Sequence, residues 1–372
     1  MKLNIVSLDN PFPPNYGGAI DIYYKIKSLH SLGCEIHLHY YYSTRQPQSK
    51  IEEFCKTVQY YQRNSILSTL FAVNLPYVVA SRNSRDLLEN LGENDFPILF
   101  EGLQSSKISN SKSLKNRKKY LRTHNVESYY MFNLAKAENS VYKKIALKLD
   151  GFRYLKFEKK LHHFNAIFTI SNNDNEFYSK YHSNIRTVLP FHGNQTITSQ
   201  EGKGSFILYH GNFDVSENLK SAKYLIEYVF NGLKFPVKIA GKNALKKLNR
   251  FNNLKNIELI ENPSNDEMNY LINFAHINIL PTFQATGVKL KLLNGLYNGR
   301  FCIVNNEMIA PTPFLKPLCE ICNASKEYKI KIEELFKKEF STDDIKNREL
   351  ILNKYFNDIK NAQLILNEIS DE

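Results

Sequence analysis

The 372-residue sequence contains no tryptophan, only four methionines and no long apolar run. A helix that spans a membrane needs about 20 predominantly apolar residues, and the nearest candidate, Ser65 to Ala80, is interrupted by Asn74 and Pro76. The N-terminal MKLNIVSLD offers only six residues between its lysine and Asp9, too few for the apolar core of a secretory signal. We therefore predict a cytoplasmic protein that is not integral to a membrane.

Cysteine is scarce, and several catalytic motifs are missing. The five cysteines are an odd number scattered along the chain, which agrees with a reducing compartment. Cys319 and Cys322 form a single C-x-x-C without a second pair or a neighbouring histidine, so they predict no zinc site. There is no P-loop, no H-E-x-x-H, no G-x-S-x-G and no Asp-x-Asp. We expect no metal and no resident cofactor.

Positive charge is concentrated in the first half of the chain. The formal net charge is +12, and residues 1–195 hold 26 Lys and Arg against 16 Asp and Glu, so that half carries +10 and the remainder +2. The densest part lies between Gly102 and Val126, where no acid occurs. It suits an anionic membrane surface or nucleic-acid phosphates, and a solvated loop is the neutral interpretation. Its basic residues are Lys107, Lys112, Lys115, Arg117, Lys118, Lys119 and Arg122.

Alternating strand and helix patterns predict two doubly wound α/β domains. Residues 3–8 form an apolar strand, residues 19–33 have helical periodicity ending at Gly33, and residues 35–42 form another strand. The alternation restarts at 205–211 and continues to 300–306. We predict an N-terminal Rossmann-like domain over 1–195 and a second over 196–341. Helices over 342–372 are expected to pack back toward the first, with Leu350, Leu352, Ile359, Leu364 and Leu366 in the core.

In the second half, the candidate chemistry lies in loops that follow strands, because open α/β sheets bind ligands at the carboxyl ends of their strands. The turn 286–289 opens a predicted helix, so its N–H groups could bind a diphosphate to which Lys289 adds charge. Since Lys291 lies only two residues further along that helix, we expect at most one of the two lysines to point at the phosphates. Taken singly, the glycine turns at the other strand ends are weak signals, and Glu261 and Asn262 are more often turn or helix-capping residues than ligand contacts. These candidates are Gly211, Asn212, Gly241, Lys242, Glu261, Asn262, Thr286, Gly287, Val288, Lys289 and Lys291.

Two segments of the first half carry further candidates. Gly17 and Gly18 lie in a loop between the first strand and its helix, although the dinucleotide fingerprint G-x-G-x-x-G is absent. His124 follows a short strand pattern and could act as a general acid or base or hold a substrate hydroxyl. A single histidine is more often structural.

Several segments together resemble GT-B glycosyltransferases of family 4 (group 1). PPNYGGAIDIYYKIKSLHSLGCEIHLH (13–39), HNVES (124–128) and FEKKLHHFNAIFTISNNDNEFY (157–178) resemble the acceptor domain of that family. LYHGNFDVSENLKSAKYLI (208–226) and FQATGVKLKLLNGLYNGRFCIVN (283–305) resemble its donor domain, the last being the most specific. The resemblance implies the GT-B architecture, two Rossmann-like domains facing a cleft.

The same resemblance implies a function and roles for residues. It implies a retaining, metal-independent transfer of a sugar from a nucleotide-sugar to a glycan or lipid-linked acceptor, in bacterial surface-polysaccharide synthesis on the inner membrane face. We therefore predict that the basic residues between Lys107 and Arg122 contact an anionic membrane surface. By it, Gly287 and Lys289 hold the diphosphate, Gly17 and Gly18 approach it, and His124 contacts the sugar. The Glu-x7-Glu signature of the family is missing. Gln284 stands near the place of the first acid, as a sugar contact, and Asn294 where related helices carry a ribose-binding Glu.

Three other functions stay open at this point. A catalytically degenerate GT-B relative is prompted by the missing acids. A sugar-nucleotide epimerase of the same fold would need several acids at its strand ends, where few occur. A basic nucleic-acid-binding protein is prompted by the charge and by 23 Tyr and 24 Phe, but these aromatic residues lie largely in apolar periodic segments, which is typical of a core. We therefore expect no nucleic-acid partner.

Overall fold

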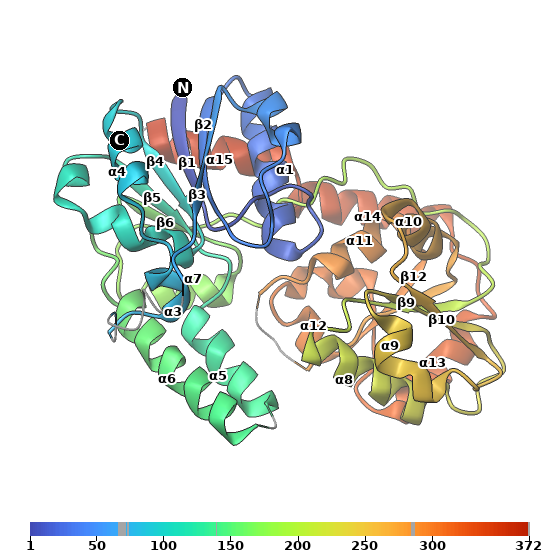
Figure 1. Cartoon of the computed structure of the whole chain (residues 1–372). Coiled ribbons are helices and arrows are strands. Elements are labelled where there is room, and N and C mark those ends of the chain that lie inside the picture. The colour runs from blue at the N-terminus through green and yellow to red at the C-terminus, as the bar shows by residue number, and fades with distance from the viewer. Residues whose placement is uncertain (66–71, 73, 139, 284–286, 371–372) are drawn as a thin grey trace. The chain divides into compact units, whose positions relative to one another are not determined.

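The computed structural model describes residues 1–65, 72, 74–138, 140–283 and 287–370. The chain divides into unit 1 (Met1–Gly193 with Phe356–Glu372) and unit 2 (Asn194–Tyr355) (Figure 1). Every pairing between the named strands of either sheet is parallel. Among the described helices, none combines the length and the hydropathy needed to cross a membrane.

Unit 1 contains a seven-stranded sheet in the order β3-β2-β1-β4-β5-β6-β7. Its strands are β1 (Lys2–Ser7), β2 (Glu35–Tyr42), β3 (Thr57–Gln62), β4 (Ile98–Glu101), β5 (Lys119–Arg122), β6 (Ala166–Thr169) and β7 (Ile185–Thr187). Its helices are α1 (Gly17–Ser31), α3 (Tyr77–Ala80), α4 (Arg85–Gly92), α5 (Glu127–Ala137), α6 (Val141–Glu158), α7 (Asn172–Tyr178) and α15 (Asp358–Ser370), with shorter 3-10 turns at η1 (Ser49–Phe54), η2 (Leu103–Asn110) and η3 (Lys112–Leu114).

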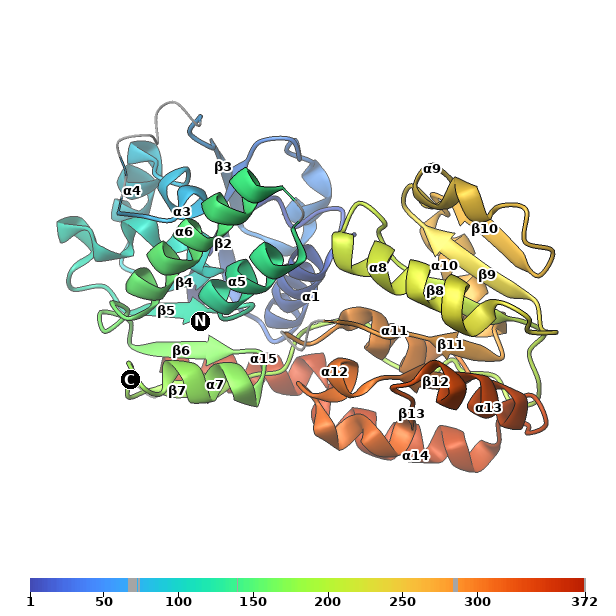
Figure 2. The same ribbon diagram turned by 90° about the horizontal axis from the view of Figure 1, so that it is seen from below.

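The sheet of unit 1 is buried on both faces, which explains why its strands are almost continuously apolar. Successive side chains of a strand point to opposite faces, so Leu3 and Ile5 pack in the core beneath α1 and α15, whereas Val6 packs in the core beneath α4, α6 and α7. Figures 1 and 2 show helices on both sides of the strands.

Unit 2 contains a six-stranded sheet in the order β10-β9-β8-β11-β12-β13, the Rossmann order. Its strands are β8 (Ile207–His210), β9 (Val237–Gly241), β10 (Ile257–Glu261), β11 (Ile277–Ile279), β12 (Phe301–Val304) and β13 (Glu320–Ile321). Its helices are α8 (Ser216–Tyr224), continued by a π-type turn η4 (Leu225–Phe230), α9 (Ala244–Leu248), α10 (Asn265–Phe274), α11 (Leu290–Asn298), α12 (Asn306–Ile309), α13 (Ser325–Leu335) and α14 (Thr342–Tyr355), with 3-10 turns η5 (Asn249–Phe251) and η6 (Pro313–Leu318). The doubly wound α/β class predicted from the sequence is confirmed in both units.

The C-terminal helices divide between the two units. Helix α14 belongs to unit 2, whereas α15 returns to unit 1 and packs against α1. Leu352 and Leu366 are buried as expected, but the expected core positions Leu350, Ile359 and Leu364 are exposed. The spacing of apolar residues therefore predicted a wider buried face on these helices than the structure has.

Only some of the basic residues between Gly102 and Val126 are exposed to solvent. Lys119 and Arg122 were predicted to meet a membrane, but both are buried because they belong to β5, which lies between β4 and β6. The Lys119 ammonium donates to the carbonyl of Leu114 at 2.7 Å. Arg117 is half-buried, and its guanidinium donates to the carbonyls of Leu91 and Asn94. Lys112 and Lys115 are exposed.

Candidate functional site

The carboxyl ends of β1 and β4 form the point in unit 1 where the strand order reverses, which is where open α/β sheets bind ligands. Glu101 is the last residue of β4, and Arg122 is the last of β5. The loop after β1 leads into α1, whose buried face carries Asp21 and Lys25 one turn apart. His124 follows β5 by two residues. These five side chains form the polar cluster of unit 1.

Close ion pairs hold this cluster together. The Lys25 ammonium lies 2.9 Å from Oδ2 of Asp21 and 2.7 Å from Oε2 of Glu101. The Arg122 guanidinium lies 3.1 Å from Oδ1 of Asp21 and also donates to the carbonyl of Val188. All four of the charged side chains are almost completely buried. The two carboxylates and two cations balance, so the cluster carries no net charge apart from the histidine.

The cations decide the ionisation of the two acids. Burial alone would raise the pKa of Asp21, but the neighbouring charges of Arg122 and Lys25 outweigh burial and hold that pKa far below its usual range. Burial likewise opposes ionisation of Glu101, and the Lys25 charge with the His124 hydrogen bond lowers its pKa. Both acids are therefore carboxylates at neutral pH.

His124 forms the outer edge of the cluster. Its Nε2 lies 3.4 Å from Oδ2 of Asp21 and 3.4 Å from Oε2 of Glu101, and its side chain is 13% exposed. A Cβ on Gly18 would lie 3.5 Å from Nδ1 of His124. The structure thus brings together His124 and Gly18 at the start of α1. Tyr16, the N-cap residue of that helix, makes no capping hydrogen bond to the first turn through its side chain.

Asp21, Glu101 and His124 also satisfy the spacing of a metal site, since one ligand atom from each lies within 4.8 Å of the others. However, the Lys25 ammonium already lies between the two carboxylates and, together with Arg122, neutralises them. A divalent ion would have to displace this buried ammonium from both of its acids. The donor set therefore fits a lysine-bridged ion pair better than a metal.

In unit 2, the corresponding reversal point lies between β8 and β11, and two glycines meet beside it. Gly211 follows β8, Gly241 ends β9, and a Cβ on Gly241 would lie 1.8 Å from the carbonyl oxygen of Gly211. Gly241 has φ of 151°. A side chain at Gly241 is therefore excluded, because the two strand ends approach each other too closely here.

Lys289, the N-cap residue of α11, and Lys291, in its first turn, both approach the start of α8. Lys289 Nζ lies 3.6 Å from Oε2 of Glu217, and Lys291 Nζ donates to Oδ1 of Asn218 at 3.1 Å. The expectation that at most one would point to this site assumed a helix starting at Gly287. Gly287 has φ of 63°, and Lys289 is an extended N-cap residue, so the helix begins only at Leu290. The helical spacing rule does not apply to the pair.

The surroundings of Lys291 suit an anion. Burial lowers its pKa to about 8, although Glu217 opposes this shift, and the charge of Lys289 lowers it further. Its ammonium also lies 5.4 Å above the ring of Tyr209. The buried His210 at the end of β8 has its pKa lowered to about 3 by burial and by Lys291, and its Nε2 has no protein hydrogen-bond partner among the described residues.

Asn212 joins this group through its neighbours. Its carbonyl accepts from Nδ2 of Asn218 at 3.0 Å, and the Asn218 side chain packs against Gly211. Gly211, Asn212, Lys289 and Lys291 are thus brought together, with Glu217 and Asn218, as the polar cluster of unit 2. Gly287 and Val288 directly precede Lys289 in the chain. Gln284 and Thr286, two further predicted contacts, lie outside the described residues.

The other predicted residues of unit 2 are engaged in local contacts. Glu261 accepts from the backbone N–H of Lys246, and Asn262 accepts from the N–H of Asn243, so both stabilise turns. Lys242 is exposed and pairs with Asp214 at 3.3 Å. Asn294 lies one turn after Lys291 on α11, where its Oδ1 accepts from Asn298 at 2.7 Å.

Sequence reasoning missed Asp21, Lys25, Glu101, Glu217 and Asn218. A signal existed for the first two, because Lys25 shares the apolar stripe of Ile22 and Leu29, and a charged residue on a buried face needs a partner. Glu101 ends an otherwise apolar strand, which is a similar signal. Nothing in the sequence indicates that Glu217 lies beside Lys289.

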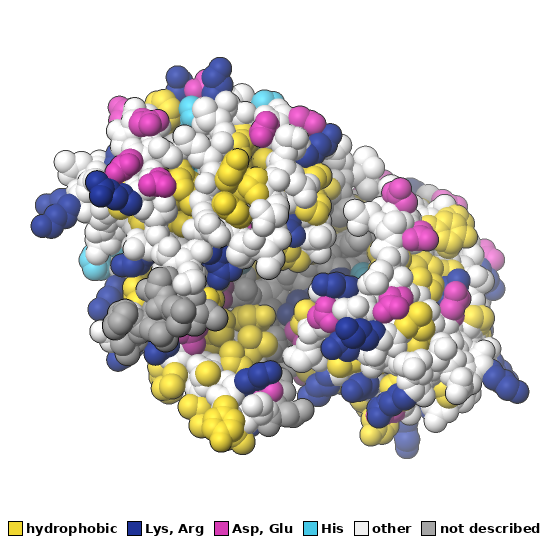
Figure 3. All heavy atoms as spheres, viewed as in Figure 1, with side chains coloured by type: hydrophobic (Ala, Val, Ile, Leu, Met, Phe, Trp, Pro, Cys, Tyr) yellow, Lys and Arg dark blue, Asp and Glu magenta, His cyan; other side chains and the backbone are white. Residues whose placement is uncertain are grey.

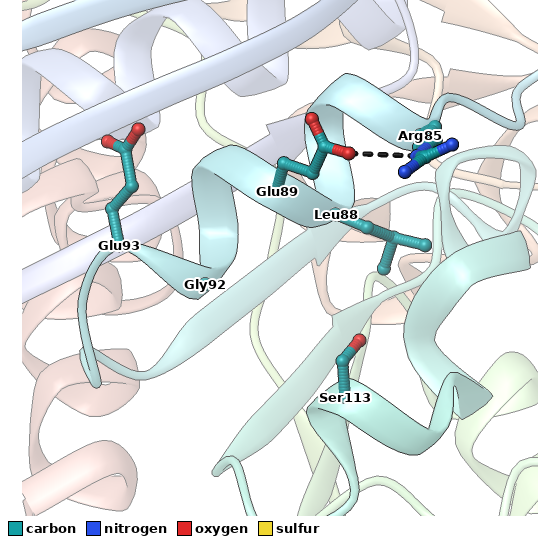
Figure 4. Close-up of a pocket in the computed structure, with 6 residues that line it drawn as sticks. All are labelled: Arg85, Leu88, Glu89, Gly92, Glu93 and Ser113. Carbon is teal, nitrogen blue, oxygen red and sulfur yellow. Dashed lines mark hydrogen bonds and ion pairs between the residues drawn. The ribbon is translucent and has the colours of Figure 1, made fainter.

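A separate hollow of about 540 Å³ lies on the surface of unit 1 along α4 (Figure 4). An ion pair of 2.8 Å between Arg85 and Glu89, both well exposed, lies at its side. None of the predicted site residues contributes to it, and it carries no cluster of buried polar groups. Its lining is formed by Arg85, Leu88, Glu89, Gly92, Glu93 and Ser113.

Comparison with known proteins identifies the fold. No family model matches the chain. A "44.6 kDa protein in cps region" of Klebsiella pneumoniae is 28% identical over 324 residues, which cover 81% of this chain and 82% of that protein. Sucrose-phosphate synthase from Thermosynechococcus elongatus matches with a TM-score of 0.72 and 12% identity over 100% of both chains.

Two further solved structures agree. The apo form of WaaB, a lipopolysaccharide outer core galactosyltransferase, matches with a TM-score of 0.64 and 14% identity over 100% of this chain and 99% of its own. S. aureus TarM, in complex with Fondaparinux, alpha-GlcNAc-glycerol and UDP, matches with a TM-score of 0.69 and 11% identity. The match covers 99% of this chain and 100% of the TarM chain. The chain therefore has the GT-B fold of glycosyltransferases, as the sequence resemblance implied.

Proposed function

We propose that this protein is a GT-B glycosyltransferase that moves a sugar from a nucleotide-sugar to a hydroxyl of a glycan or lipid-linked acceptor in bacterial surface-polysaccharide synthesis. The observation that carries the proposal is the convergence of Lys289 and Lys291 at the strand-end edge of unit 2. The cps-region relative and the complex of TarM with UDP support the pathway and the donor class.

Unit 2 is proposed to hold the donor. Two ammonium groups suit a diphosphate, because their charges are in place before the ligand arrives, and Gly211 and Gly241 are proposed to lie beside it. Glu217 pairs with Lys289 and partly neutralises the site. An incoming diphosphate would compete with this carboxylate for the lysine. Asn294 is proposed to contact the ribose, without the charge that an acid would bring.

Unit 1 is proposed to supply His124 to the transferred sugar. Asp21 and Glu101 both approach Nε2 of His124, so the ring is held in one orientation at the edge of the sheet. We propose transfer with retention and without a metal. The leaving diphosphate would accept the acceptor proton, and the protein would supply positive charge and orientation.

Nucleotide binding tests the proposal directly. Purified protein is heated with UDP, GDP, CMP, dTDP or ADP, each with and without Mg²⁺, and the melting temperature is recorded. A ligand at about 100 times its dissociation constant stabilises by about 2.7 kcal/mol. We expect one diphosphate to stabilise the wild type without Mg²⁺.

Variants assign the site. The same nucleotide should stabilise Lys289→Ala far less, whereas the control Lys346→Ala, an exposed lysine of α14, should respond like the wild type. If no nucleotide stabilises the wild type, a catalytically degenerate relative becomes the better interpretation. The asparagine at position 294, where related helices carry an acid, would agree with that interpretation.

A further inference from the structure

Helix α6 of unit 1 exposes an apolar stripe on the face opposite to its buried one. The buried face consists of Gly151, Tyr154 and Glu158. At about 100° per residue, the exposed apolar residues fall within an arc of about 100° on the other side. Their exposed fractions are 65% for Val141, 88% for Tyr142, 52% for Ile145, 53% for Leu149 and 56% for Phe152.

The helix is firmly attached beneath this stripe. A Cβ on Gly151 would lie 2.7 Å from the ring of Phe132, so glycine lets α5 and α6 pack closely. Phe132 and Phe152 meet edge to face at 5.1 Å. The Ser128 hydroxyl at the start of α5 donates to Glu158 at the end of α6 at 2.6 Å. The stripe is thus a fixed surface of an ordered helical hairpin. Figure 3 shows hydrophobic side chains gathered over this end of the unit.

Basic side chains accompany the stripe. Lys144 and Lys148 lie along one border of it, and Lys156 lies within its arc. The acids of α6 do not offset them, since Glu158 is buried and Asp150 pairs with Arg153 at 3.6 Å and accepts from the N–H of Tyr77. The basic residues of α6 are Lys143, Lys144, Lys148, Arg153 and Lys156.

We propose that α6 is an interfacial helix that lays this stripe on an anionic membrane surface. A helix with lysines bordering large apolar side chains inserts those side chains among lipid tails while its cations meet the headgroups. A hollow of about 500 Å³ beside the helix is lined by both apolar and charged residues, among them Leu149, Lys143 and Arg153.

Other occupants fit less well. A second copy would bring the same three lysines, Lys144, Lys148 and Lys156, against their equals, and like charges oppose association. A nucleic acid would satisfy the cations but leave five large apolar side chains in water. The inference stands on α6 alone and holds whether or not the chain is a transferase. It moves the expected membrane contact away from Lys107–Arg122, where two of the seven basic residues are buried.

Vesicle sedimentation tests this surface with the full chain. The vesicles contain phosphatidylcholine with about 30% phosphatidylglycerol, or phosphatidylcholine alone. We expect binding to the anionic vesicles and little to the neutral ones. The variant Tyr142→Ser/Ile145→Ser/Leu149→Ser should bind at least about tenfold more weakly, because it removes the inserting side chains. The control Ile330→Ser/Leu350→Ser, which changes exposed apolar residues of unit 2, should bind like the wild type.

Two further measurements make the outcome decisive. The variant Lys144→Gln/Lys148→Gln should weaken binding and reduce its dependence on salt. All variants should keep the melting temperature of the wild type and its response to nucleotide. Equal binding by wild type and stripe variant would overturn the proposal, as would no binding by the wild type. A dimer in lipid-free solution, measured by light scattering and lost in the stripe variant, would assign the stripe to a second copy instead.

Discussion

The polar clusters of the two units lie at equivalent places in their sheets but differ in charge and burial. In unit 1, Asp21 and Glu101 balance Lys25 and Arg122, and all four are buried. In unit 2, two lysines share the single carboxylate of Glu217, and Lys289 and Glu217 are 21% and 16% exposed. A balanced, buried cluster is suited to hold a side chain in place, whereas an accessible excess of positive charge is suited to attract an anion.

The largest effect is expected from unbalancing unit 1. Lys25→Met leaves two buried carboxylates without their shared ammonium, which should lower the free energy of unfolding by about 3–5 kcal/mol. Urea denaturation measures the loss. The control Lys27→Met changes an exposed lysine on the same helix and should cost less than about 1 kcal/mol. Equal losses would mean that the ion pairs do not stabilise the unit.

Removing His124 should distinguish a role in the reaction from a role in the stability of unit 1. His124→Ala leaves the two acids and two cations balanced, so the free energy of unfolding should change by less than about 1 kcal/mol. If the histidine contacts the reacting sugar, kcat should fall on the order of 100-fold. Steady-state turnover of the nucleotide-sugar found by the binding screen gives kcat, with exposed His162→Ala as the control. An unchanged kcat would remove His124 from the proposed site.

The pH dependence of nucleotide binding should report on unit 2. Lys291 has its pKa lowered to about 8, so its ammonium is present below that pH and is lost above it. Because the charged form attracts a diphosphate, the dissociation constant should rise above pH 8, by at most about tenfold per pH unit. Isothermal titration from pH 6.5 to about 9.5 measures this. In Lys291→Gln the rise should vanish, and its persistence would assign the titration to another group.

The smallest change should come from making unit 2 more positive. Glu217→Gln removes the carboxylate that pairs with Lys289, so the dissociation constant for the nucleotide diphosphate should fall about three- to tenfold, or about 0.7–1.4 kcal/mol. The control Glu227→Gln alters an exposed acid that pairs with Arg250. Weaker binding by Glu217→Gln would show that this carboxylate orients the lysine rather than competing with the ligand.

The sequence predicted the fold well because both sheets are parallel and buried. Their strands are short apolar runs that alternate with helices, and runs such as residues 3–8 and 205–211 correspond closely to β1 and β8. Helix boundaries that depend on backbone conformation were harder to predict from the sequence. The start of α11 is delayed to Leu290 by the positive φ of Gly287, which the spacing of apolar residues does not reveal.

The candidate site was only partly predictable, because tertiary pairing decides which charges are exposed. Arg122 belongs by sequence to a basic run, yet it pairs with Asp21, about 100 residues earlier in the chain. The residues next to Arg122 in the sequence therefore give no sign of this partner. His124 and Gly18 could be recognised because each follows a strand of its own, and strand ends of a parallel sheet meet at one edge.

Helix α15 has a consequence for how the chain is made. Ala362, Ile365 and Ile369 complete the core that α1 begins with Ile22 and Ile26. The ribosome therefore releases most of unit 1 first but delivers its last core helix only after all of unit 2 has been synthesised. Until then, the apolar residues of α1 can pack on β1 and β2 but lack the cover that α15 provides. Folding of unit 1 should finish after translation of unit 2, and chaperones would meet an exposed α1 during that interval.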